Sequence, residues 1–183
     1  MAGNITLKDL SFTPYLSEEQ IRQRVQEMGQ ELKELYADRT PLFLVMLNGA
    51  FLFGSDLVRA FKGDAEISFV RARSYAGTAS THQVEMVVGP SAAEIQGRHI
   101  IIVEDIVDSG LTMSHFLPLL QSHQPASIFL ATLLLKPDML VNEIPIDMVG
   151  FEIPPKFVVG YGLDYDGLGR NLDCIYQLVS EEV

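Results

Sequence analysis

Four consecutive β-branched apolar residues, Ile100 to Val103, are followed directly by Glu104 and Asp105. Uninterrupted apolar runs of this kind are typical of strands in a parallel sheet, which are buried on both faces. The two carboxylates have no use in packing, so we expect them at the carboxyl end of the strand, in the open. Small polar residues at 108–112 then lead into a helix that is predicted to reach about His123. Because open α/β sheets bind ligands beyond the carboxyl ends of their strands, this stretch predicts a sugar-phosphate site.

The length and charge of the chain exclude several classes of protein. A chain of 183 residues predicts one domain with a sizeable core. Its formal net charge of −11 argues against a nucleic-acid partner or an anionic membrane surface, since both require an excess of Lys and Arg. Cys174 is the single cysteine and no secretory signal or membrane-spanning run is visible. We therefore expect a cytoplasmic protein.

The periodicity of the chain predicts an α/β fold with a mainly parallel sheet flanked by helices. Residues 17–20 have the form of a capping box, and an apolar stripe predicts a helix from there to about Tyr36. Pro118 should kink or shorten the helix that follows the site. We expect one domain over residues 1–183, with a small hood formed by the N-terminal arm and roughly residues 138–183. Strands are predicted at 42–47, 65–71, 84–88, 100–103, 127–135, 148–151 and 175–179, with a short apolar piece at 157–162, and further helical segments at 51–61 and 112–123.

Three other segments carry polar groups to the ends of predicted strands. Asn48 and Gly49 form a tight turn after the strand at 42–47, and Lys136 follows the strand at 127–135. Residues 73–82 form a polar hairpin loop that is either an insertion or a lid. Judged by spacing alone, the first turn is more simply an ordinary strand-to-helix turn, and Lys136 is more simply a solvated lysine at a strand end.

The stretch from Val103 to Thr112 resembles the phosphoribosyl-diphosphate loop of the type I phosphoribosyltransferases. That loop has four apolar residues, two acids, a short polar loop, and then Thr or Ser, Gly and Thr. The similarity extends in the family's order from about residue 5 to residue 178. The segments that resemble the 6-oxopurine members, the hypoxanthine(-guanine) phosphoribosyltransferases, are 47–51, 73–75, 133–137 and 150–165.

This resemblance implies a purine salvage reaction. Ribose 5-phosphate would pass from phosphoribosyl diphosphate to hypoxanthine, and to guanine, forming IMP or GMP and releasing diphosphate. Bond breaking at the anomeric carbon would pass through an oxocarbenium-like state, with Mg²⁺ as the cofactor. The family also implies a homodimer or homotetramer, with no nucleic acid and no membrane as partners.

The resemblance assigns the sugar-phosphate side of the site as follows. Asp108 would exchange a proton with purine N7, although by spacing alone it is equally a turn or cap residue. Glu104 and Asp105 would bind the ribose hydroxyls, directly or through Mg²⁺. The 5′-phosphate would be held by Ser109, Gly110, Leu111 and Thr112, aided by the helix start.

The resemblance likewise assigns the purine and diphosphate sides. Lys136 would donate to the 6-oxo group, Phe157 would stack on the purine, and Val158 would offer backbone contacts. Asp164 falls among the purine-site residues and would also hold Mg²⁺ on the diphosphate. The remaining assignments are Arg170, Asn48 and Gly49 to the diphosphate, and Ser74 and Tyr75 to a lid.

One position departs from the family pattern and two other functions compete. Many relatives carry Lys or Arg where Asn48 stands, so only a backbone role is implied there. A sister transferase that prefers xanthine and guanine would share the same motif. A non-enzymatic sensor of phosphoribosyl diphosphate could keep the fold but could lose Asp108 or the lid and would gain a basic face, whereas this chain keeps both and is acidic.

Overall fold

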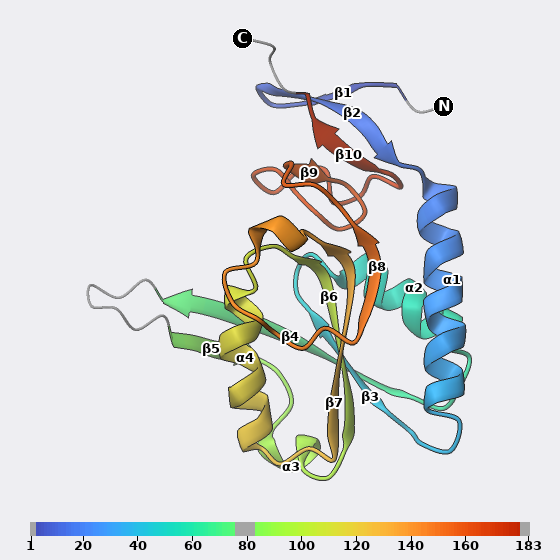
Figure 1. The fold of residues 1–183 in the computed structure, drawn as a ribbon, viewed down its shortest axis with the longest axis vertical. Coiled ribbons are helices and arrows are strands. Elements are labelled where there is room, and N and C mark those ends of the chain that lie inside the picture. Colours follow the sequence, from blue (N-terminus) through green and yellow to red (C-terminus); the bar gives the residue numbers. More distant parts are fainter. Residues whose placement is uncertain (1–2, 76–82, 180–183) are drawn as a thin grey trace.

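The computed structural model describes residues 3–75 and 83–179, with the backbone alone for 72–75 and 83–87. Its centre is a six-stranded sheet in the order β5-β4-β3-β6-β7-β8 (Figure 1). Five of these strands run parallel and only β5 is antiparallel, to β4. The expected mainly parallel α/β fold is thus confirmed. The strands are β3 (Leu42–Met46), β4 (Glu66–Tyr75), β5 (Gln83–Val88), β6 (His99–Val107), β7 (Ser127–Leu135) and β8 (Met148–Glu152).

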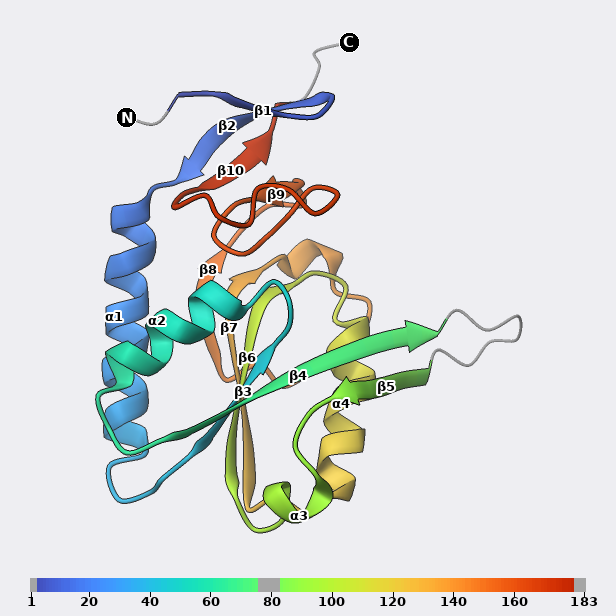
Figure 2. The same ribbon diagram turned by 180° about the vertical axis from the view of Figure 1, so that it is seen from behind.

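Helices flank this sheet (Figure 2). The side chain of Ser17 accepts from the Gln20 N–H and Gln20 reaches back to the Ser17 N–H, so the expected capping box is confirmed. A Cβ atom at Gly29 would overlap Ala60, which shows how closely α1 and α2 pack. Pro118 lies inside α4 without ending it. The helices are α1 (Glu18–Leu35), α2 (Phe51–Phe61), α3 (Ala92–Ile95) and α4 (Leu111–Ser122), with a 3₁₀ turn η1 (Pro137–Met139).

A second, four-stranded sheet lies beyond one end of the main sheet, where Figure 1 shows blue and red strands side by side. We call it the hood. Its order is β1-β2-β10-β9, so it joins the two ends of the described chain. Phe12, Val159 and Tyr176 form its small buried core. Its strands are β1 (Ile5–Leu7), β2 (Leu10–Leu16), β9 (Val158–Val159) and β10 (Ile175–Leu178).

One expectation about the C-terminal part was wrong in detail. Residues 148–152 were expected in the hood, but as β8 they pair with β7 in the main sheet. The apolar piece 157–162 forms only the two-residue strand β9, because residues 160–163 turn sharply at Gly160 and Gly162, both with φ of 101°. Within the described ranges, no helix is long and apolar enough to cross a membrane.

Candidate active site

Asp108 and Lys136 form an ion pair at the carboxyl ends of two neighbouring strands, β6 and β7. The Nζ atom of Lys136 donates to Oδ2 of Asp108 at 2.7 Å. The lysine side chain is only 9% exposed, so its charge depends on this partner. Oδ1 of Asp108 is buried and has no hydrogen-bond partner among the described residues. One carboxylate oxygen of the pair is therefore left without a partner in the described part of the chain, although the Asp108 side chain as a whole is 44% exposed.

Glu104 and Asp105 lie inside β6, although the sequence predicted them after the end of the strand and exposed to solvent. The expectation of open carboxylates was wrong: β6 continues to Val107 because β7 runs alongside it, and both acids are half-buried. Burial and the neighbouring Asp105 raise the pKa of Glu104 well above its ordinary value. Burial also raises the pKa of Asp105 to about 6, opposed by backbone hydrogen bonds and Arg170. Nearby positive charge therefore does not offset the cost of burying these two carboxylates in their ionised form.

The loop from Ser109 to Thr112 leads directly into α4. Gly110 is the N-cap, and its φ of 76° favours glycine at this tight entry into the helix. Oγ of Ser109 accepts from the N–H of Leu111 at 3.4 Å, while Leu111 and Thr112 are exposed. The loop thus presents backbone donors and hydroxyls at a helix start, which is an arrangement that suits a phosphate group.

The turn at Asn48 and Gly49 lies against Asp105. A Cβ atom at position 49 would overlap Oδ2 of Asp105, so a larger residue there would displace the Asp105 carboxylate. On its other side the turn touches the hood, since a Cβ at Gly162 would overlap the carbonyl oxygen of Gly49. Asn48 itself is exposed. The sequence assigned Gly49 correctly to a tight turn, but nothing in the sequence indicated Gly162 as its neighbour except the glycines that flank Tyr161.

Asp164 and Arg170 are paired, a relationship that the sequence did not reveal. Nη2 of Arg170 lies 2.7 Å from Oδ1 of Asp164, and Nη1 donates to the carbonyl of Gly162 at 2.7 Å. Oδ2 of Asp164 accepts from the N–H of Gly167 at 2.7 Å. Both charged groups act on the pKa of Asp105, Arg170 lowering it and Asp164 raising it. The structure therefore brings this pair, the Gly49 turn and Asp105 together.

Phe157 and Val158 belong to the hood. The Phe157 ring is 43% exposed and lies edge-on to Tyr165, with the ring centroids 5.9 Å apart. Val158 is buried in β9 and pairs with Gln177 of β10. Among the described residues, no hydrogen bond joins Phe157 or Val158 to Lys136, whose side chain bonds to Asp108. Their purine-binding roles remain predictions.

The lid and the metal ligands are the least defined assignments. The backbone of Ser74 and Tyr75 ends β4, but their side chains and residues 76–82 lie outside the described residues. Among the side chains that are described, no group of three acidic, His or Cys residues is arranged to hold a metal ion. Glu104, Asp105 and Asp164 are therefore not gathered as one ligand set. The adjacent pair Glu104 and Asp105 still offers the oxygen donors that Mg²⁺ prefers.

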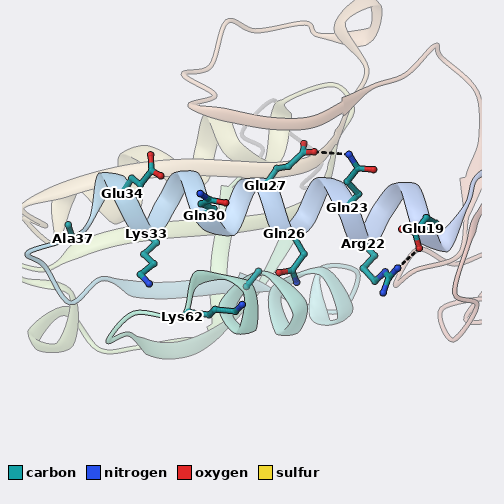
Figure 3. A pocket seen from close by; sticks show the side chains of 11 residues that line it. Glu19, Arg22, Gln23, Gln26, Glu27, Gln30, Lys33, Glu34, Ala37 and Lys62 are labelled. Carbon is teal, nitrogen blue, oxygen red and sulfur yellow. Dashed lines mark hydrogen bonds and ion pairs between the residues drawn. The ribbon is translucent and has the colours of Figure 1, made fainter.

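A hollow of about 910 Å³ lies elsewhere, along the outer side of α1 (Figure 3). Its lining is made of long polar and charged side chains such as Gln26, Lys33 and Lys62. Figure 3 shows Arg22 paired with Glu19 and Gln23 donating to Glu27, all on the solvent side. No buried polar group points into the hollow among the residues that line it, so we assign it no chemistry.

Known proteins resemble this chain over most of its length. A family model described as the phosphoribosyl transferase domain matches residues 13–166. A hypoxanthine phosphoribosyltransferase of Haemophilus influenzae is 38% identical over 170 residues, covering 91% of this chain and 95% of the relative. A hypoxanthine-guanine phosphoribosyltransferase of Bacillus subtilis is 40% identical over 160 residues, covering 87% and 89%. The crystal structure of a hypoxanthine phosphoribosyltransferase from Staphylococcus aureus has a TM-score of 0.84 at 36% identity, covering 91% and 90%.

Proposed function

The chain belongs to the phosphoribosyl transferase family and is a purine salvage enzyme of the hypoxanthine(-guanine) type. We propose that the Asp108–Lys136 pair recognises the purine base in its reaction. The substrates that the family implies are phosphoribosyl diphosphate and a purine base. A 6-oxopurine carries N7 and O6 side by side on one edge. The 2.7 Å pair puts an acceptor and a donor side by side in the same way, and this observation carries the proposal.

Asp108 handles the proton in this proposal. Its carboxylate takes the N7 proton while N9 attacks the anomeric carbon of the ribose and the bond from that carbon to diphosphate breaks. Lys136 donates to O6 and stabilises the charge that develops on the base as its proton leaves. The 6-amino group of adenine would place a donor against the ammonium. The pair therefore selects oxopurines over adenine.

The strand-end acids and the loop hold the sugar. Glu104 and Asp105 accept from the ribose hydroxyls, and the segment from Ser109 to Thr112 binds the 5′-phosphate at the start of α4. Phe157 stacks on the base and Val158 contacts its edge through the backbone. Held in this way, the substrates meet in line for an oxocarbenium-like transfer.

The diphosphate side is formed by the Asn48–Gly49 turn and Arg170. Backbone groups of the turn and the planar guanidinium bind the diphosphate oxygens. The raised pKa values of Glu104 and Asp105 support a cation beside them, where this pair would hold Mg²⁺ against the ribose. Asp164 would separately hold Mg²⁺ bound to the diphosphate. Bound there, Mg²⁺ would supply charge neutralisation for the departing diphosphate. Ser74 and Tyr75 would close over the site and exclude water.

The proposal extends to the whole chain. Residues 1–183 would act as one phosphoribosyltransferase domain whose hood, with the connections around it, covers the site. The protein would be cytoplasmic and would assemble as a homodimer or homotetramer, which a solution mass measurement tests.

Turnover with a panel of bases tests this function. Purified protein is supplied with Mg²⁺, phosphoribosyl diphosphate and hypoxanthine, guanine, xanthine or adenine, and nucleotide and diphosphate are measured. We expect IMP from hypoxanthine and GMP from guanine, and none of the adenine nucleotide. Preference for xanthine would favour the sister transferase, and no turnover with any base would refute the enzyme and favour the sensor.

A further inference from the structure

A tyrosine that has no role in the proposed reaction ties the hood to the helix behind the diphosphate turn. The Oη atom of Tyr161 donates to Oδ2 of Asp56 at 2.7 Å. Tyr161 is buried in the turn at 160–163, and Asp56 lies in α2. Since α2 begins directly after the Asn48–Gly49 turn, the bond joins the two turns that meet at the diphosphate side.

The backbone at Tyr161 is unusual for a residue with a large side chain. Its φ is 49°, between Gly160 and Gly162 with φ of 101° each. A third glycine would adopt this left-handed conformation without steric cost, whereas tyrosine is strained there. The backbone N–H donates to the carbonyl of Leu172 at 2.8 Å, which glycine could do equally well. What glycine could not supply is the side chain that reaches Asp56.

The turn that carries Tyr161 is in contact with the diphosphate groups. Gly162 lies so close to the carbonyl oxygen of Gly49 that a Cβ atom would overlap it. Arg170 donates to the carbonyl of Gly162 at 2.7 Å, and the N–H of Gly162 donates back to the carbonyl of Arg170 at 2.9 Å. A shift of Gly162 would therefore move both the Gly49 turn and the guanidinium.

We propose that Tyr161 is a positioning residue for diphosphate binding, because its hydrogen bond to Asp56 clamps the 160–163 turn onto the Asn48–Gly49 turn. This inference rests on the proposed function, which assigns the diphosphate to Gly49 and Arg170. Burial, together with the Asp56 carboxylate, raises the pKa of the Tyr161 phenol, so the hydroxyl keeps the proton that it donates at neutral pH.

The test compares Tyr161→Phe and Asp56→Ala with a matched control, Tyr36→Phe. Tyr36 is likewise buried, but its ring packs edge-on against His99 and Phe129 near the amino ends of the parallel strands, away from the site. We expect Tyr161→Phe to raise the KM for phosphoribosyl diphosphate about tenfold, with kcat and the KM for hypoxanthine changed less than about threefold. The control should leave both KM values unchanged. A double variant should raise KM no further than Tyr161→Phe alone, since both changes remove the same bond.

Binding of diphosphate with Mg²⁺, measured by calorimetry, needs no turnover and separates the two proposals. A weakening of about tenfold in Tyr161→Phe and none in Tyr36→Phe would support the clamp even if the wild type proved inactive. Unchanged diphosphate affinity and unchanged KM in Tyr161→Phe would overturn the clamp while leaving the enzyme proposal intact. An equal loss in Tyr36→Phe would also overturn it, because the effect would then be general loss of stability.

Discussion

The ammonium of Lys136 and the carboxylate of Asp108 lie 2.7 Å apart at the ends of adjacent parallel strands. They are 28 residues apart in the chain, and strand pairing of β6 with β7 makes them neighbours. The pair satisfies a nearly buried lysine before any base arrives, so the site is held ready without an unpaired internal cation. The proposal that this pair recognises the purine rests on this contact.

Lys136→Met should weaken purine binding and leave sugar binding intact. The variant removes the donor to O6 while keeping a side chain of similar length. We expect the KM for hypoxanthine to rise about tenfold or more, because a hydrogen bond from a charged donor is lost. Steady-state kinetics with each substrate varied in turn measures the split. An effect on the affinity for phosphoribosyl diphosphate alone would move Lys136 to another part of the site.

Asp105→Asn should stabilise the protein at neutral pH in Mg²⁺-free buffer. Asp105 has a pKa of about 6 in the folded state, above its ordinary value of 3.8, so folding favours the protonated carboxyl. Stability is therefore lost as the pH rises from about 4 through about 6, and is low above that range. We expect the free energy of unfolding at pH 7.5 to increase by on the order of 2 kcal/mol in the variant.

Denaturant unfolding at pH 4 and pH 7.5 checks the effect of Asp105→Asn. The gain should vanish near pH 4, where the wild-type carboxyl is protonated in both states. Asp38→Asn, at an exposed carboxylate between α1 and β3, serves as the control and should change little at either pH. Destabilisation at pH 7.5, or the same gain at both pH values, would contradict the claim that the ionised carboxylate of Asp105 destabilises the folded protein.

Arg24→Met should destabilise the fold through the edge strand β8. Nε and Nη2 of Arg24 donate to the carbonyls of Gly150 and Val149 at 3.2 and 2.9 Å, so α1 covers the open edge of the sheet. We expect a loss of about 1–3 kcal/mol in the free energy of unfolding. Arg22→Met is the matched control on the same helix. Because Arg22 pairs with Glu19 in solvent, its loss should cost at most about 1 kcal/mol. Equal costs would show that the carbonyl contacts contribute nothing.

Local patterns predicted the elements, and long-range pairing decided what the patterns could not. The capping box at Ser17 and the strand that begins near Ile100 are each determined by a few neighbouring residues, so the sequence predicted them. The burial of Glu104 does not, because it depends on how far β7 continues beside β6. The contact of Gly162 with Gly49 joins residues more than a hundred positions apart. The sequence could therefore place groups at strand ends but could not pair them.

The most direct test of the central claim is the variant Asp108→Asn. Asparagine keeps the shape of Asp108 but cannot take the N7 proton, so we expect turnover to fall by about 10²-fold or more. Equilibrium binding of phosphoribosyl diphosphate, measured in parallel, should remain nearly intact because the sugar is held by other groups. Wild-type turnover in Asp108→Asn would contradict the proton role, and with it the reading of the purine by the Asp108–Lys136 pair.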